Sequence, residues 1–295
     1  MDLAIDCEKL NKHYPHFDLA DVDLKVPTGT VMGFVGPNGA GKSTTMQIIM
    51  GLTTRDSGSV TVLGHPVPEQ QVAAKQGIGY VTEDMRLYAG QTLGFHMRFV
   101  RSLYPGWDDA YASELLRRFK LDANQKTKGF SHGQRVKALL LLALAHHPRL
   151  LILDEPTTGL DPVARQEVLR GMMEVIQDES RSVLFSSHNT LDVEQISDHI
   201  AFIQDGRIVA ANDKESFLDS WRRIRIELPA ASAVPCPEKM VSVTRSGDMT
   251  VVVTNCFDES LPGLLGGSAC VRQVTRMTLE EIFLESVAAA PEVIA

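Results

Sequence analysis

The sequence predicts an α/β fold with a mostly parallel core sheet. Strand-like and helix-like segments alternate along the chain up to about residue 220, which is typical of layered α/β domains. Residues 150–153 form a continuous apolar run, as expected for a parallel strand buried on both faces. A second apolar run, at residues 30–35, leads directly into a glycine-rich turn and then into a helical pattern at residues 43–50.

The other elements of this domain follow in order. Short apolar stretches at residues 3–10 and 19–26 predict strands of an antiparallel edge sheet, and residues 53–64 predict a turn, a strand and a turn. Between about residues 84 and 148, apolar side chains recur every three or four residues, which predicts an inserted helical subdomain. The later pattern predicts helices at 163–176 and 191–196, and strands at 182–186, 200–203 and 207–210.

The character of the sequence changes after Trp221. The pattern predicts three more strands, at residues 225–228, 240–244 and 250–254, with a hairpin turn at 246–248. It also predicts a last helix at residues 279–287. We therefore expect two domains, one at residues 1–221 and a small β-rich accessory module at residues 222–295. The module is expected either to make packing or dimer contacts or to sense a ligand.

Composition excludes some classes of protein. The net charge of −8 and the pI near 5.6 argue against a general nucleic-acid binder, which would present a basic surface. The four cysteines follow no metal-binding spacing and are expected to be reduced thiols of a cytosolic protein. No secretory signal is evident, and the longest apolar run, residues 138–145, is far shorter than the roughly 18 residues of a membrane span.

A phosphate-binding loop is the most specific motif in the chain. The segment Gly36-Pro37-Asn38-Gly39-Ala40-Gly41-Lys42-Ser43 matches G-x-x-x-x-G-K-[ST] and lies between the apolar run and the helix that this chemistry requires. Glycines let the backbone N–H groups converge on phosphate oxygens. Lys42 can reach the β- and γ-phosphates, and the Ser43 hydroxyl can bind Mg²⁺. We include Thr44, at the start of the helix, in the nucleotide-binding set because a helix N-terminus attracts phosphate.

Two acids and a histidine follow later strands. Asp154 comes directly after the apolar run at 150–153, where its carboxylate can hold Mg²⁺. Glu155 lies one residue further, where a carboxylate can polarise an attacking water. His188 follows the apolar strand at 182–186 and can donate a hydrogen bond to the γ-phosphate.

The order of these motifs resembles the ATP-binding subunit of an ABC transporter. The phosphate loop is followed by Ser131-His132-Gly133-Gln134, then by the Asp154–Glu155 pair, by Gly159-Leu160-Asp161 and by His188. The likeness covers about residues 3 to 220. Residues 277–283 also resemble the C-terminal extensions of ATPase subunits that pair with ABC-2-type export permeases.

The resemblance implies roles for further residues. Tyr14 stands where the family stacks an aromatic ring on adenine, and Ser131, Gly133 and Gln134 match the signature motif that contacts the γ-phosphate bound to the other subunit. Asp161 matches the loop that crosses the dimer interface. The catalytic set is then Lys42, Glu155 and His188, and the Mg²⁺ ligands are Ser43, Glu83 and Asp154.

Two positions depart from the pattern of the family. The usual signature is Leu-Ser-Gly-Gly-Gln, but this chain has Phe130 and His132 in place of the leucine and the first glycine. Where the family usually has glutamine, this chain has Glu83. A carboxylate there can still bind Mg²⁺ through oxygen but adds negative charge beside the γ-phosphate.

The resemblance implies an ATPase that uses ATP and Mg²⁺ and works as a dimer, either a homodimer or a heterodimer. Closure of the dimer on ATP would drive a separate integral membrane permease. This implies a peripheral position in the cytoplasm, at the inner face of the cell membrane, with export as the expected direction. No nucleic-acid partner is expected. The alternative is a soluble non-transport ABC ATPase that acts in translation, DNA metabolism or regulation.

Overall fold

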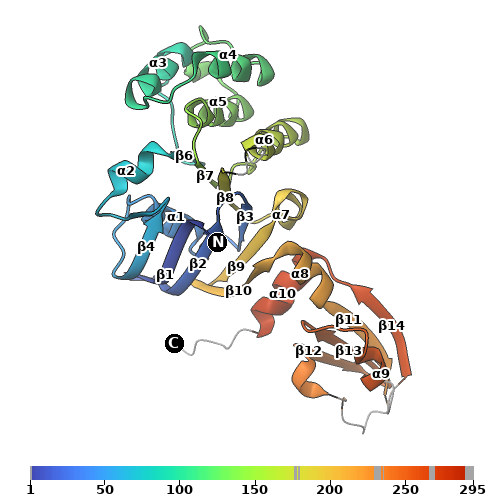
Figure 1. Cartoon of the computed structure of the whole chain (residues 1–295). Coiled ribbons are helices and arrows are strands. Elements are labelled where there is room, and N and C mark those ends of the chain that lie inside the picture. Colours follow the sequence, from blue (N-terminus) through green and yellow to red (C-terminus); the bar gives the residue numbers. More distant parts are fainter. Residues whose placement is uncertain are drawn as a thin grey trace. The chain divides into compact units, whose positions relative to one another are not determined.

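The computed structural model describes residues 2–175, 178, 180–228, 234, 236–265 and 270–289. The chain folds into two compact units, residues 1–208 and residues 209–295, and each is described here by itself (Figure 1). The units divide ahead of residue 221 because helix α8 (Lys214–Ser220) contacts helix α10 (Leu279–Ala289) of the second unit. The division into a catalytic domain at residues 1–221 and an accessory module at residues 222–295 remains a prediction.

A mostly parallel sheet forms the centre of the first unit, and the edge strand β10 of this sheet continues past residue 208. Its strand order is β10-β9-β3-β8-β7-β6. The bounds are β3 (Val31–Val35), β6 (Ile78–Thr82), β7 (Leu150–Asp154), β8 (Ser182–Ser187), β9 (His199–Gln204) and β10 (Arg207–Asp213). The pairs from β9 through β6 are parallel, and every residue of β3, β7 and β8 is buried. The continuous apolar runs are therefore parallel strands covered on both faces, as predicted.

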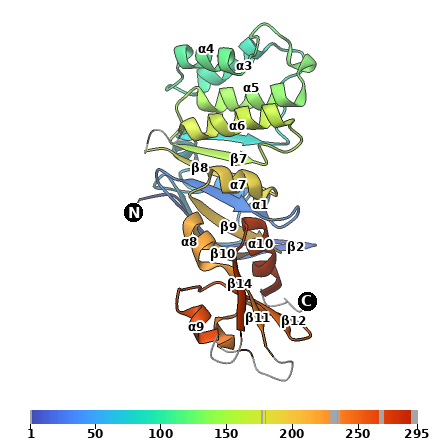
Figure 2. The same cartoon turned by 90° about the vertical axis from the view of Figure 1, so that its right-hand side faces the viewer.

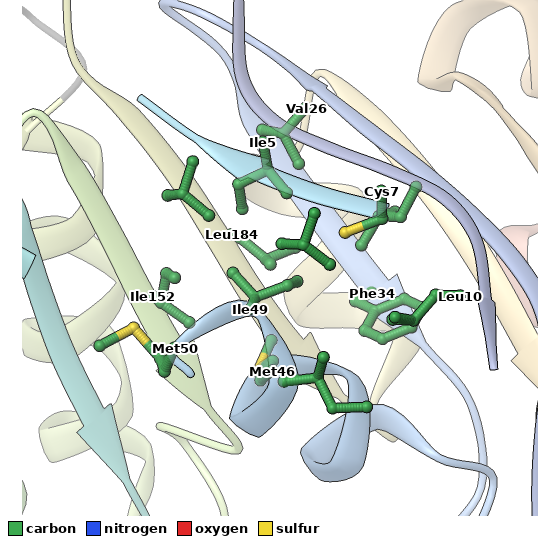
Figure 3. Packing of buried hydrophobic residues seen from close by; sticks show 14 of the residues in the cluster. Ile5, Cys7, Leu10, Val26, Phe34, Met46, Ile49, Met50, Ile152 and Leu184 are labelled. Carbon is green, nitrogen blue, oxygen red and sulfur yellow. The ribbon is translucent and has the colours of Figure 1, made fainter. Parts of the chain in front are cut away.

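A second, antiparallel sheet packs against this core. Its order is β2-β1-β4-β5, with β1 (Leu3–Tyr14), β2 (Phe17–Pro27), β4 (Ser57–Val62) and β5 (His65–Pro66). Ile5 and Leu10 of β1 meet Phe34 of β3 and Met46 of helix α1 (Lys42–Ile49) in one buried cluster (Figure 3). The antiparallel edge sheet is thus confirmed, and its two long strands extend beyond the predicted stretches at partly exposed ends.

The predicted helical subdomain contains three helices and a 3₁₀ turn. They are α3 (Leu93–Leu103), α4 (Asp109–Arg118), η1 (Thr127–Gly129) and α5 (His132–Leu144). Each α-helix begins after a side-chain cap, at Thr92, Asp108 and Ser131 respectively. Figure 2 shows α5 between α6 (Pro162–Val175) and the pair of α3 and α4, in agreement with their contacts.

The second unit is a four-stranded antiparallel sheet with helices. Its order is β12-β13-β11-β14, with β11 (Arg222–Glu227), β12 (Ser242–Ser246), β13 (Met249–Thr254) and β14 (Cys270–Arg276). It also contains α8, α9 (Leu261–Leu265), α10 and the 3₁₀ turn η2 (Pro237–Lys239). One face buries Ile224, Ile226 and Val252 beneath Leu261 and Leu265 of α9. The unit therefore has a hydrophobic core of its own.

Some elements were missed by the sequence patterns. β14, α8 and α9 were not predicted, and neither were β6 and the short helix α2 (Gln71–Gln76). Most of β14 is exposed and alternates only weakly, because it is an edge strand. The predicted helix at 163–176 is α6, although residue 176 lies outside the described residues. α7 (Thr190–Ile196) and α10 agree with the predicted helices within one or two residues.

Candidate active site

The phosphate loop connects β3 to α1 and depends on glycine at two contacts. A Cβ at Gly36 would lie 2.3 Å from the carbonyl oxygen of Ile203, and one at Gly41 would lie 2.8 Å from Cζ of Phe17. Gly41 also has a φ of 109°, and Gly39 has a φ of 82°. Side chains at these positions would be strained or would clash. The backbone can therefore form a tight cradle at the N-terminus of α1.

Lys42 is buried at the base of this loop. Its Nζ donates hydrogen bonds to the carbonyl oxygens of Gly36 and Pro37 at 2.7 and 3.1 Å. The same atom lies 3.1 Å from Oε1 of Glu155, and the two side chains are only 5% and 11% exposed. The ammonium is thus held between the phosphate loop and the carboxylate that follows β7.

Glu155 is fixed by a network of hydrogen bonds. Its Oε2 accepts hydrogen bonds from Oγ1 of Thr158 at 2.9 Å and from Nδ1 of His188 at 2.8 Å. Its backbone N–H donates to Oγ of Ser186, and its φ is 52°. Oε1 is buried and lies 3.1 Å from the Lys42 ammonium, and no other described residue donates a hydrogen bond to it.

The charge state of Glu155 follows from opposing effects. Burial raises the pKa of Glu155, but the Lys42 ammonium and the hydrogen bonds from His188 and Thr158 outweigh burial. Its pKa therefore lies below the ordinary value of 4.5. Glu155 is a carboxylate at neutral pH and can accept a hydrogen bond from water.

Oxygen ligands line a cavity of about 520 Å³ beside this network. Its wall includes Ser43, Glu83, Asp154 and Glu155. Asp154 is 7% exposed and accepts a hydrogen bond from Oγ of Ser186 at 2.6 Å. Burial, with a smaller contribution from the Asp154 carboxylate, raises the pKa of Tyr80 in the same wall, so its phenol stays neutral.

This donor set fits a hard cation that is held partly by phosphate. All three predicted ligands offer oxygen, the atom that Mg²⁺ prefers. Across the described ranges, no group of three or more His, Cys, Asp and Glu side chains is placed to hold a metal ion. A site of this kind fits Mg²⁺ if the remaining ligands come from a nucleotide and from water.

The Ser131–Gln134 segment forms the start of α5. The Ser131 hydroxyl accepts from the N–H of Gln134 at 3.2 Å, and the Gln134 side chain accepts from the N–H of Ser131 at 2.9 Å. This is a capping box. A Cβ at Gly133 would lie 3.2 Å from Cβ of Ala164 in α6. Among the residues that the structure describes, no hydrogen bond or ion pair joins Ser131, Gly133 or Gln134 to Lys42 or Ser43.

The other predicted residues lie at the edges of the site. Oδ1 of Asp161 accepts from the N–H groups of Val163 and Ala164 and so caps α6. Tyr14 ends β1 and is paired with Phe17, whose ring lies against the phosphate loop at Gly41. Nζ of Lys12 lies 5.5 Å from the centroid of the Tyr14 ring.

Sequence reasoning missed three contributors to this site. Ser186 joins Asp154 to the backbone of Glu155, Thr158 holds the Glu155 carboxylate, and Phe17 packs on the phosphate loop. A hydroxyl residue at the end of an otherwise apolar strand, as in Phe185-Ser186, is the signal that could have indicated the first. The other two have no comparable local signal.

The structure contains no helix, among its described residues, that is long and apolar enough to cross a membrane.

Comparisons with known proteins agree with this geometry. A family model described as ABC transporter matches residues 19–158. The ABC transporter ATP-binding protein YtrB of Bacillus subtilis is 27% identical over 268 residues, which cover 90% of this chain and 91% of that protein. The Nod factor export ATP-binding protein I of Rhizobium etli is 33% identical over 223 residues, 73% of this chain and 70% of that protein.

A solved structure shows the same fold. The ATP-binding subunit of an ABC transporter superposes with a TM-score of 0.67 and 28% identity, and it covers 74% of this chain and 92% of its own. Identity above 30% with the Nod factor export protein extends over more than two thirds of that relative. The chain therefore belongs to the family of ABC transporter ATP-binding proteins, and it is an ATPase of that family.

Proposed function

We propose that this chain is the ATP-hydrolysing subunit of a membrane exporter and that it drives a separate permease by ATP-dependent closure of a dimer. The observation that carries the proposal is the convergence of Lys42, Glu155 and His188 on one network beside a cavity lined by Ser43 and Asp154. Phosphoryl transfer to water needs such an arrangement of cation, base and metal ligands. The catalytic domain is assigned to residues 1–221, with residues 222–295 as an accessory module.

Each catalytic side chain has one task. The N–H groups of the phosphate loop, residues 36–44, hold the phosphates, and Lys42 leaves its contact with Glu155 to bind the β- and γ-phosphates. Oε1 of Glu155, which Lys42 contacts in this structure, then orients the attacking water. Nδ1 of His188, together with Thr158, keeps the carboxylate in place, and the opposite ring nitrogen donates to the γ-phosphate in the imidazolium form, which carries a proton on both nitrogens.

Ser43, Asp154 and Glu83 supply oxygen ligands for Mg²⁺, with Ser186 orienting Asp154. The metal, when bound, neutralises charge on the β- and γ-phosphate oxygens. Tyr14 stacks on the adenine from the end of β1.

The dimer is inferred from the signature segment. Ser131, Gly133 and Gln134 present the N-terminus of α5, which suits an anion. Since they make no hydrogen bond or ion pair with Lys42 or Ser43 in the described parts of their own chain, they are available to a nucleotide on a second subunit. Asp161, which caps α6, orders the loop beside the same interface. Both homodimers and heterodimers satisfy this requirement.

Membrane partnership and direction are supported by the names of the relatives. The Rhizobium protein is named as an export ATP-binding protein, and YtrB as an ABC transporter ATP-binding protein. We therefore assign this chain to the inner face of the membrane, bound to a permease, and expect no nucleic-acid partner. The relatives do not favour a non-transport ATPase.

Glu155→Gln tests the proposal. The amide cannot act as a base, so hydrolysis of Mg-ATP should fall by at least about 100-fold, a typical loss for a general base. ATP binding should persist, and the protein should be trapped as a dimer in size-exclusion chromatography with ATP. Affinity capture of this variant from membranes with ATP should recover an integral membrane protein.

Lys42→Ala is the matched control and should lose ATP binding and ATP-dependent dimerisation together. Normal hydrolysis by Glu155→Gln, or normal ATP affinity of Lys42→Ala, would contradict the proposed mechanism. Recovery of a ribosomal or DNA-bound complex instead of a membrane protein would contradict the transport role.

A further inference from the structure

The histidine in the signature segment makes a contact that glycine could not make. His132 is the first residue of α5, directly after the Ser131 cap. Its Nε2 lies 2.9 Å from the carbonyl oxygen of Thr158, which is 26 residues later in the chain. Because a carbonyl oxygen can only accept, Nε2 must carry the proton and donate it. The imidazole also lies against Gly159, where a Cβ would stand 3.5 Å from the same nitrogen.

Thr158 continues the connection to the catalytic carboxylate. Its Oγ1 donates to Oε2 of Glu155 at 2.9 Å, and its N–H donates to the backbone carbonyl of Glu155 at 3.3 Å. The side chain of Thr158 therefore holds the carboxylate while its carbonyl is held by His132. Two hydrogen bonds separate the imidazole from Oε2 of Glu155.

The backbone around Glu155 needs such support. Glu155 has a φ of 52°, which costs about 1 kcal/mol or more for a residue with a Cβ. The next turn contains Gly159, with a φ of 69°. A strained residue of this kind persists when the surrounding structure holds it in place. His132 provides one contact to this segment from a different element.

We propose that His132 is a positioning residue that joins the signature segment to the catalytic carboxylate of the same chain. This inference rests on the proposed function, in which Glu155 orients the attacking water. Through Thr158, His132 keeps the Glu155 carboxylate oriented so that Oε1 points at the attacking water. When Ser131 binds the nucleotide of a second subunit, the same helix start therefore also fixes the orientation of Glu155. The family glycine cannot make this link because it has no side chain.

A pair of substitutions of equal length isolates the hydrogen bond. His132→Gln keeps an N–H donor near the position of Nε2, and His132→Met has similar length but no donor. Steady-state hydrolysis of Mg-ATP by the full chain should show kcat lowered about 3- to 10-fold in His132→Met, which is the loss of one hydrogen bond, with KM nearly unchanged. His132→Gln should recover most of the wild-type kcat.

A double-mutant cycle tests the route through Thr158. Thr158→Val removes the hydroxyl that holds Glu155 and should also lower kcat. If both changes interrupt one connection, the double variant His132→Met/Thr158→Val should be no slower than the slower single variant. Multiplied effects would mean independent roles and would overturn the inference.

Two other results would overturn it as well. One is a wild-type kcat in His132→Met. The other is an equal loss of kcat in His132→Gln and His132→Met, which would indicate that the side chain acts only through packing. Glu155→Gln is measured in parallel. If this variant retained ATP hydrolysis, the proposed function itself would fail. If it lost hydrolysis while the His132 variants behaved like wild type, only this inference would be rejected. Melting temperatures of the variants identify any that fail to fold, and the remaining Gln or Met variant is then compared with wild type.

Discussion

At the scale of single residues, the site is governed by one buried ion pair. Lys42 and Glu155 are almost fully removed from water, and breaking a buried pair by removing one partner typically costs about 3–5 kcal/mol. The two carbonyl oxygens that also accept from Lys42 reduce this cost for loss of Glu155. The Lys42 ammonium lowers the pKa of Glu155, and in the proposed mechanism the same ammonium binds the phosphates of ATP. One side chain therefore takes part both in binding ATP and in setting the charge state of the carboxylate.

Glu83 is the residue at which this chain departs most from the expected metal site. It lines the cavity together with Asp84, Asp154 and Glu155, which places four carboxylates near one nucleotide position. Like charges at about 4 Å repel by about 1 to 4 kcal/mol, depending on exposure. Without Mg²⁺, we expect this repulsion to weaken ATP binding.

Glu83→Gln should therefore bind metal-free ATP several-fold more tightly and should show a weaker Mg²⁺ dependence of turnover. Titration with ATP in the presence of a chelator, followed by Mg²⁺ titration of the ATPase rate, measures both. Asp84→Asn is the matched control, because it removes one charge from the same wall without touching the predicted ligand. Identical behaviour of wild type and Glu83→Gln would reject the role of Glu83.

At the scale of elements, α3 and α5 are joined where both end. Tyr104, the C-terminal cap of α3, stacks on His146, just after α5, with ring centroids 4.0 Å apart and planes 17° apart. Burial lowers the pKa of His146 to about 4. The folded protein therefore holds this imidazole neutral over a range where the unfolded chain takes up a proton.

This contact predicts acid sensitivity in a defined window. In the unfolded chain the pKa of His146 is about 6.5, so the unfolded state binds a proton as pH falls below that value. The folded state does not bind this proton until about pH 4. The free energy of unfolding therefore decreases across that window, by about 2 kcal/mol after allowance for partial solvent contact. His146→Phe keeps the stacked ring and removes the proton. Urea denaturation at about pH 7 and about pH 5 should show a smaller loss in this variant than in wild type.

An equal loss of stability in His146→Phe and wild type would reject this explanation. Between about pH 7 and about pH 5, the range of this test, the contribution of Glu155 to stability does not change. Because the pKa of Glu155 is lowered in the folded state, its stabilising effect is present above its ordinary value of 4.5 and is lost only as pH falls through the lower folded value.

Elements also differ in how far they could be predicted. β3, β7 and β8 are entirely buried, so the apolar run at the centre of each strand identifies it in the sequence. β14 is exposed along most of its length, and its polar residues are compatible with a loop. Only its pairing with β11 makes it a strand, and that pairing joins residues about fifty positions apart.

At the scale of the whole molecule, each compact unit has its own hydrophobic core. In the first unit, Phe34, Ile152 and Leu184 of the parallel sheet belong to one cluster with residues of the antiparallel sheet. In the second, Ile224 and Ile226 pack beneath α9. Separate cores allow the two units to lose structure independently.

Ile226→Ala should test this independence. Removing a fully buried isoleucine side chain costs about 2–5 kcal/mol, and the cost should fall on the second unit alone. Hydrogen exchange should then accelerate in β11 and β13 while β3 and β7 stay protected and ATP affinity is unchanged. Ile152→Ala is the matched substitution in the first unit and should show the opposite distribution. Loss of protection in β3 or β7 on changing Ile226 would mean that the units unfold together.

The sequence by itself determined the phosphate loop, the acidic pair at the end of β7 and the alternation of buried strands and helices, because these depend on neighbouring residues and on local spacing. Only the tertiary structure decided what holds Glu155 in place: Ser186 and His188 come from 31 and 33 residues away, and His132 reaches Thr158 across 26. Such contacts depend on which strand ends and helix starts the packed core brings together. No local pattern encodes that arrangement.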